Sequence, residues 1–89
     1  MMSDDVLILD VRTQAEFNNT HIENAVLLPH TEIRENAEGI IGEKDRVVLV
    51  YCRVGRRSEI ASRELVELGF YKVYDFGGIM QWPFAVVTG

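Results

Sequence analysis

The chain has 89 residues, 47% of them hydrophobic and 26% charged, and a formal net charge of −5 at pH 7. This composition excludes a disordered or low-complexity chain and predicts an ordinary soluble domain. The length fits one domain over residues 1–89 and is too short for two. The acidic balance argues against nucleic acid and against anionic membrane surfaces as partners.

Membrane segments, metals and disulfides are also not expected. No apolar stretch is long enough to cross a bilayer, and acidic residues stand where a signal peptide needs a basic start. The sequence as written is therefore predicted to be cytoplasmic, whereas a chain from which a leader had been removed would be periplasmic. The single cysteine excludes an intramolecular disulfide, and no group of residues has zinc-ligand spacing, so we expect neither metal nor cofactor.

The first half of the chain alternates between apolar runs and short helical patterns. Thr13 and Glu16 have the spacing of a capping box, which marks a helix start, and Pro29 stops the second apolar run. The predicted order is a strand over residues 6–9, a short helix after Thr13, a strand over 25–28, a weak helix over 31–38 and a loop over 38–46.

The second half contains the most strongly apolar run. Residues 47–51 are apolar without alternation, as expected for a central strand buried on both faces of a parallel sheet. The remaining predictions are a helix over 57–68, a strand over 71–76, a break at Gly77-Gly78 and a last helical turn over 79–82, which Pro83 ends. Strands separated by helices predict an α/β fold with a small parallel sheet of about four to five strands flanked by helices.

Cys52 follows the predicted central strand at the carboxyl edge of the sheet, where ligands bind in open α/β folds. The next residues turn the chain into a helix, and backbone N–H groups at such a turn stabilise an anion. Four of the nine basic residues crowd into this segment: Arg53, Arg56, Arg57 and Arg63. We interpret Cys52 as a reactive thiolate with a lowered pKa. The alternative is a buried cysteine that acts as a small hydrophobe, and Arg63 fits an ordinary solvated helix face.

Three motifs resemble the rhodanese-like sulfurtransferases. Cys52-Arg53-Val54-Gly55-Arg56-Arg57 is similar to the six-residue active-site loop of that family. The stretch from Ile8-Leu9-Asp10-Val11-Arg12 through His21-Ile22 to Leu28-Pro29 is similar to its N-terminal signature, and Gly77-Gly78-Ile79-Met80-Gln81-Trp82 to its C-terminal segment. Family members commonly have glycines where this chain has Thr20 and Asn24, so that loop is expected to differ in shape.

The resemblance implies a thiosulfate sulfurtransferase that carries sulfur as a Cys52 persulfide, from thiosulfate or a similar small anion to cyanide or a thiol, including a protein thiol. The implied substrate-binding residues are Arg53, Val54, Gly55, Arg56, Arg57 and Ser58, with Ser58 also interpreted as a helix cap. The implied structural residues are Asp10, Arg12, His21 and Trp82.

Two other readings of the loop stay open. Cysteine-dependent phosphatases and arsenate reductases on the same fold place five residues between cysteine and arginine, whereas four separate Cys52 from Arg57. Tyr51 also replaces the histidine that often precedes a phosphatase cysteine. These differences favour sulfur transfer. A persulfide carrier in protein sulfur trafficking would have the same cysteine, and the sequence does not separate it from a thiosulfate enzyme.

Overall fold

A four-stranded parallel sheet with the strand order β3-β1-β4-β5 forms the centre of the computed structural model, which describes residues 6–82 and 86–87. A short antiparallel pair joins β2 to β6. The elements are β1 (Val6–Asp10), α1 (Gln14–Asn19), β2 (His21–Ile22), β3 (Val26–Leu27), the 3₁₀ turn η1 (His30–Glu32), α2 (Ile33–Ile41), β4 (Val47–Cys52), α3 (Arg56–Glu67), β5 (Val73–Gly78), the 3₁₀ turn η2 (Ile79–Gln81) and β6 (Val86–Val87). The predicted α/β class, the parallel pairing and the inner position of β4 are confirmed.

The two faces of the sheet are both covered, which explains the unbroken apolar run of β4. Val48, Val50 and Cys52 belong to the core cluster that α2 and α3 complete. Tyr51 belongs to a second cluster on the other face, with Ile8 and Ile22. Because side chains alternate along a strand, Cys52 lies on the same face as α3, to which β4 leads.

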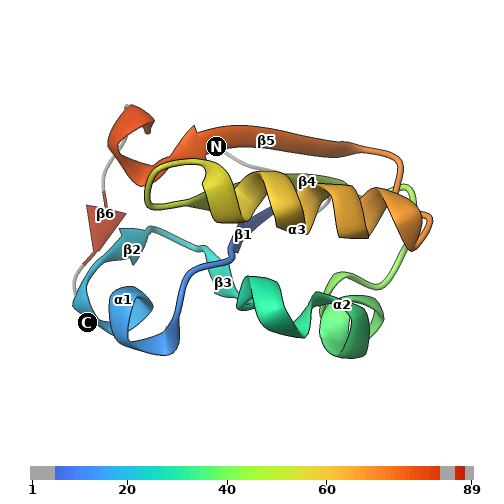
Figure 1. Ribbon diagram of the computed structural model, residues 1–89, viewed down its shortest axis with the longest axis horizontal. Coiled ribbons are helices and arrows are strands. Elements are labelled where there is room, and N and C mark those ends of the chain that lie inside the picture. The colour runs from blue at the N-terminus through green and yellow to red at the C-terminus, as the bar shows by residue number, and fades with distance from the viewer. Residues whose placement is uncertain (1–5, 83–85, 88–89) are drawn as a thin grey trace.

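The carboxyl ends of the strands lie together at one end of the molecule. Figure 1 shows the turn from β4 into α3 at the left, at the same end as α1, β2 and β6. The predicted capping box starts α1, since the Thr13 hydroxyl accepts from the Glu16 N–H at 3.2 Å and the Glu16 carboxylate accepts from the Thr13 N–H at 3.1 Å. Two segments far apart in the sequence, α1 and the turn from β4 into α3, lie beside each other, because Glu16 of α1 pairs with Arg57 at the start of α3.

Most predicted bounds differ from the structure by one or two residues, and two segments differ by more. The helix expected over residues 31–38 begins at Ile33, after η1, and runs to Ile41, because Ile33, Ala37 and Ile41 are spaced to bury one face. The loop expected over 38–46 is therefore shorter. The strand expected to break at Gly77-Gly78 instead continues through both glycines, and its register with β4 shifts between Val50 and Tyr51.

Residues 20–24 take the chain from α1 to β3 through the two-residue strand β2, which the sequence does not predict. Asn24 has a φ of 72°, and it is the one non-glycine residue with a positive φ in the described part of the chain. Asparagine tolerates this left-handed conformation better than most residues, so it occupies a position of the kind that favours glycine. The final helical turn is observed as η2, whereas Pro83, expected to end it, lies outside the described residues.

Candidate active site

Cys52 is the last residue of β4, and its side chain is fully buried beneath the start of α3. Gly55 has a φ of 102° and turns its N–H toward the sulfur, at 2.9 Å from Sγ. The Ser58 Oγ lies 3.6 Å from the same sulfur and donates to the Gly55 carbonyl at 3.0 Å. The turn after Cys52 therefore encloses the sulfur with polar groups of a helix N-terminus.

The Ser58 side chain does not cap α3, contrary to one interpretation of the sequence. The helix begins at Arg56 with Gly55 as the N-cap residue, and no side chain caps it. Ser58 lies one turn further along and is fully buried beside Cys52. A hydroxyl beside the sulfur can stabilise negative charge there, which a solvent-facing cap would not do.

The pKa of the Cys52 thiol is lowered in spite of its burial. Burial is the largest influence and by itself raises the pKa, because it disfavours the thiolate. The hydrogen bond with the Ser58 side chain and those from the backbone N–H groups of Ser58, Gly55 and Val54 act in the opposite direction and together outweigh it. The arrangement thus favours a thiolate, which is the nucleophilic form of cysteine.

This pKa can be tested by alkylating Cys52 over a range of pH. We expect the alkylation rate to reach half its maximum at a pH below the usual thiol pKa of about 8.5. Ser58→Ala should move this midpoint to higher pH, because the thiolate then lacks a hydrogen bond that stabilises it. Ser62→Ala is the matched control, since it removes a serine hydroxyl from the same helix that has no hydrogen-bond partner in the structure. A midpoint that Ser58→Ala leaves in place would contradict the assigned role of the hydroxyl.

Gly78 holds the loop close to the sheet, a role that sequence reasoning missed. In the β4–β5 pairing Gly78 stands opposite Cys52. A Cβ atom added at Gly78 would lie 2.4 Å from the Arg53 carbonyl oxygen and 3.3 Å from the Val54 Cα. Only a glycine lets the backbone of the loop pass this close to β5. The glycine pair that resembled the family's C-terminal segment therefore shapes the active-site loop directly.

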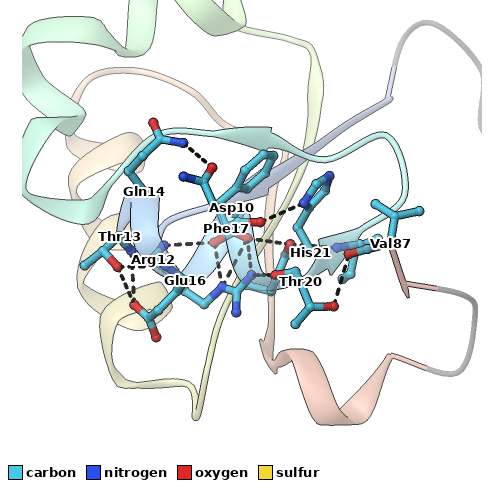
Figure 2. A network of polar contacts seen from close by, with 12 residues as sticks. Asp10, Arg12, Thr13, Gln14, Glu16, Phe17, Thr20, His21 and Val87 are labelled. Atoms are coloured by element: carbon cyan, nitrogen blue, oxygen red, sulfur yellow. Dashed lines mark hydrogen bonds and ion pairs between the residues drawn. The ribbon is translucent and has the colours of Figure 1, made fainter. Parts of the chain in front are cut away.

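A buried polar network supports the loop from the other face of the sheet. The Arg12 Nε and Nη2 atoms donate to the Asp10 carboxylate at 2.9 and 2.7 Å, and Nη2 also donates to the Thr20 carbonyl (Figure 2). The Tyr51 hydroxyl donates to Asp10 at 2.6 Å and accepts from the Ile22 N–H at 3.1 Å. Burial, followed by the bond to Asp10, raises the Tyr51 pKa, so the phenol stays protonated. This network fixes β1, β2 and β4 relative to one another.

The remaining signature residues are placed at the edge of this network. The His21 Nδ1–H donates to the Phe17 carbonyl at 2.9 Å, and the His21 ring stacks on the Phe17 ring with the ring centres 3.8 Å apart. The Trp82 ring packs against Phe76 with the ring centres 5.2 Å apart. These contacts place His21 and Trp82 among packed aromatic rings.

Arg57 forms an ion pair with Glu16 that spans 41 positions of sequence. Its Nη1 and Nη2 atoms donate to the two carboxylate oxygens at 2.7 and 2.9 Å. The hydrogen bond from Arg57 is the main reason that the pKa of Glu16 falls to about 2. Glu16 is therefore ionised throughout the physiological range. The sequence indicated Glu16 as half of a capping box and as part of the N-terminal signature, but not its pairing with Arg57.

A pocket of about 550 Å³ opens beside the loop. Its lining residues are Arg12, Glu16, Asn19, Thr20, Arg53, Val54, Ile79 and Met80. Arg53 and Arg56 are exposed, and so are Val54 and Met80, whose exposed fractions reach 79% and 89%. Cys52 is fully buried, so a ligand in this pocket reaches the sulfur only with a movement of the loop or of neighbouring side chains. The candidate site thus has a cationic side and an apolar side.

A buried cysteine whose pKa is lowered, at a strand-to-helix turn followed by arginines and beside a pocket, is the arrangement typical of a nucleophilic cysteine. The described residues contain no group of three or more histidine, cysteine, aspartate or glutamate side chains that could hold a metal ion. None of the helices in the same residues is long and apolar enough to cross a membrane.

Comparison with known proteins places this chain in a family. Residues 1–84 match the rhodanese-like domain, and the chain belongs to that family. It is 39% identical over 79 residues to the thiosulfate sulfurtransferase GlpE of Coxiella burnetii, and the matched region covers 88% of this chain and 72% of that protein. It is 31% identical over 81 residues to the thiosulfate sulfurtransferase PspE of Escherichia coli, covering 91% and 78%. A solved structure described as rhodanese with anions from E. coli has a TM-score of 0.90 at 30% identity and covers 94% of this chain and 99% of that one.

Proposed function

We propose that this chain is a thiosulfate sulfurtransferase that works through a persulfide on Cys52. The observation that carries the proposal is the cradle of N–H groups and the Ser58 hydroxyl around a buried sulfur whose pKa is lowered. Family membership and the names of two relatives, each similar over most of its length, support it. The proposed substrate-binding residues are those of the loop from Arg53 to Ser58.

The reaction has two displacements. The Cys52 thiolate attacks the outer sulfur of thiosulfate, a new S–S bond forms, and the S–S bond of thiosulfate breaks with its electron pair leaving on sulfite. Cyanide or a thiolate then attacks the outer sulfur of the persulfide, which returns Cys52 as a thiolate and releases thiocyanate or a new persulfide. No proton has to be removed in the first step, because Cys52 attacks as the anion. The same N–H groups that stabilise the thiolate are suited to stabilise the anionic persulfide.

Arg53 is the cation best placed to meet the donor, since it is exposed and lines the pocket. We expect Arg53→Ala to raise the thiosulfate KM about three- to tenfold, as removal of one charge–charge contact at a solvated site does, with a smaller effect on kcat. Steady-state kinetics with thiosulfate and cyanide measure this. Arg63→Ala, an exposed arginine further along α3, is the control and should leave the KM unchanged. An unchanged KM for Arg53→Ala would remove Arg53 from donor binding.

The phosphatase alternative is tested with the same preparations. Hydrolysis of p-nitrophenyl phosphate that Cys52→Ser abolishes, in a protein without thiosulfate turnover, would contradict sulfur transfer. The four-residue spacing between Cys52 and Arg57 supports the sulfur reaction over this alternative.

A persulfide carrier is the second candidate, favoured by the apolar side of the pocket. Val54 and Met80 are largely exposed there. A small anion such as thiosulfate or cyanide gains no binding energy from an apolar surface. Large exposed apolar side chains beside a reactive group suit contact with another protein. Persulfide accepted from a cysteine desulfurase, without thiosulfate turnover, would favour this function. The compartment also stays a prediction, cytoplasmic for the sequence as written and periplasmic for a chain whose leader was removed.

A further inference from the structure

Glu16 neutralises the arginine that ends the active-site loop. Both carboxylate oxygens are engaged by the two terminal nitrogens of Arg57, and the two side chains are 27% and 25% exposed. The hydrogen bonds to Glu16 and, to a smaller extent, the charge of Cys52 raise the pKa of Arg57, so Arg57 lies within electrostatic reach of the sulfur. Its positive charge faces a carboxylate that is itself anchored at the start of α1 by Thr13.

The positive potential that an anion meets in the pocket beside the loop is therefore lower than the number of nearby arginines indicates. Glu16 and Arg12 line this pocket, and Arg12 is held by the Asp10 carboxylate. Arg53, also in the lining, is exposed, and the structure shows no ion pair for it among residues 6–82 and 86–87. Arg12 and Arg57 are thus matched by carboxylates, whereas Arg53 and Arg56 are exposed. Of these two exposed arginines, Arg53 lines the pocket and is the one placed to attract a donor.

We propose that Glu16 is a specificity-determining residue, whose carboxylate competes with the donor for Arg57 and limits the positive potential at Cys52. This inference deepens the proposed function, and its expected effects on thiosulfate and sulfite binding rest on that function. A donor such as thiosulfate and the departing sulfite are both dianions, so a site with several unpaired arginines would bind both tightly and release the product slowly. The ion pair keeps anion binding weak enough for turnover.

Glu16→Gln tests the proposal because it removes the charge and keeps the size of the side chain. We expect the thiosulfate KM and the inhibition constant for sulfite to fall about three- to tenfold, as adding one net positive charge within about 10 Å of a solvated anion predicts. A role of Glu16 that was only structural would instead raise the KM. The decrease should shrink in high salt, where such interactions are screened.

A second readout does not depend on turnover. Iodoacetate, an anion, and iodoacetamide, its neutral counterpart, both alkylate Cys52, and the ratio of their rates reports the potential that an anion meets near the sulfur. Glu16→Gln should raise this ratio by about three- to tenfold, for the same electrostatic reason. A wild-type protein that does not turn over thiosulfate would contradict the proposed function. An alkylation ratio that is the same in Glu16→Gln and in the wild type would contradict the role of Glu16.

Two control variants separate charge at the pocket from charge and stability elsewhere. Glu67→Gln makes the same charge change at the far end of α3, where Glu67 pairs with Arg34. Thr13→Ala weakens the capping box but leaves the pair with Arg57. Neither should change the alkylation ratio. If Glu16→Gln does not fold, Arg57→Gln replaces it as the test. Arg57→Gln leaves the Glu16 carboxylate without its cation, so the ratio of the iodoacetate rate to the iodoacetamide rate should fall. A ratio that does not fall would overturn the proposal.

Discussion

Cys52→Ser is expected to lower the thiosulfate:cyanide activity by at least about 10³-fold, because a serine hydroxyl cannot accept a sulfane sulfur as a stable persulfide. The physical reason is local. Sulfur is more polarizable than oxygen, the pKa of the Cys52 thiol is lowered here, and the N–H group of Gly55 and the Ser58 hydroxyl are arranged around the sulfur. A steady-state assay with purified protein measures the loss.

The fold is expected to survive this substitution. Serine is close to cysteine in size, and the Gly55 N–H that contacts the sulfur can donate to a hydroxyl oxygen instead. We expect the free energy of unfolding to change by less than about 2 kcal/mol, which denaturant titration measures. Turnover retained by a folded Cys52→Ser protein would show that another group carries the sulfur.

Gly78→Ala is expected to have the second largest effect, a decrease in kcat/KM of about 10²-fold, as displacement of catalytic groups by about 1 Å predicts. The added methyl group would lie 2.4 Å from the Arg53 carbonyl oxygen and 3.2 Å from its carbonyl carbon. These are backbone atoms, so the contact cannot be relieved by a change of rotamer. The loop after Cys52 has to move away from β5, and the N–H groups around the sulfur move with it.

Gly39→Ala is the matched control for this prediction. It adds the same methyl group within α2, where nothing lies within 4 Å of the added atom. Alanine is the better helix former, so this variant should be about 0.5 to 1 kcal/mol more stable and fully active. Thermal unfolding and steady-state kinetics on both variants are the measurements. A Gly78→Ala protein with wild-type kcat/KM would contradict the close approach of the loop to β5.

The sequence predicted the elements well where local patterns decide them. The unbroken apolar run of β4 indicated a strand with two covered faces, and both clusters of the core are found on it. The Thr13 capping box gave the start of α1, and the helical spacing after Gly55 gave α3. The family resemblance was likewise confirmed, because it rested on three motifs in their order along the chain.

The errors come from contacts between distant segments. Gly77 and Gly78 looked like a strand break, since glycine is a poor strand former, yet the pairing of β5 with β4 overrides that preference. Glu16 was interpreted as a capping residue and as part of the N-terminal signature, and its pairing was missed because nothing local shows that Arg57 lies beside it in the fold. Ser58 was read as a cap because serine prefers that position, whereas the left-handed Gly55 takes it.

The most direct test of the persulfide mechanism is intact-protein mass spectrometry after thiosulfate has been added and removed. The protein should gain the mass of one sulfur atom, the site should map to Cys52, and addition of cyanide should remove it as thiocyanate. Cys52→Ser should gain nothing. A protein that consumes thiosulfate without acquiring this mass, or that carries the sulfur on another residue, would contradict transfer through Cys52.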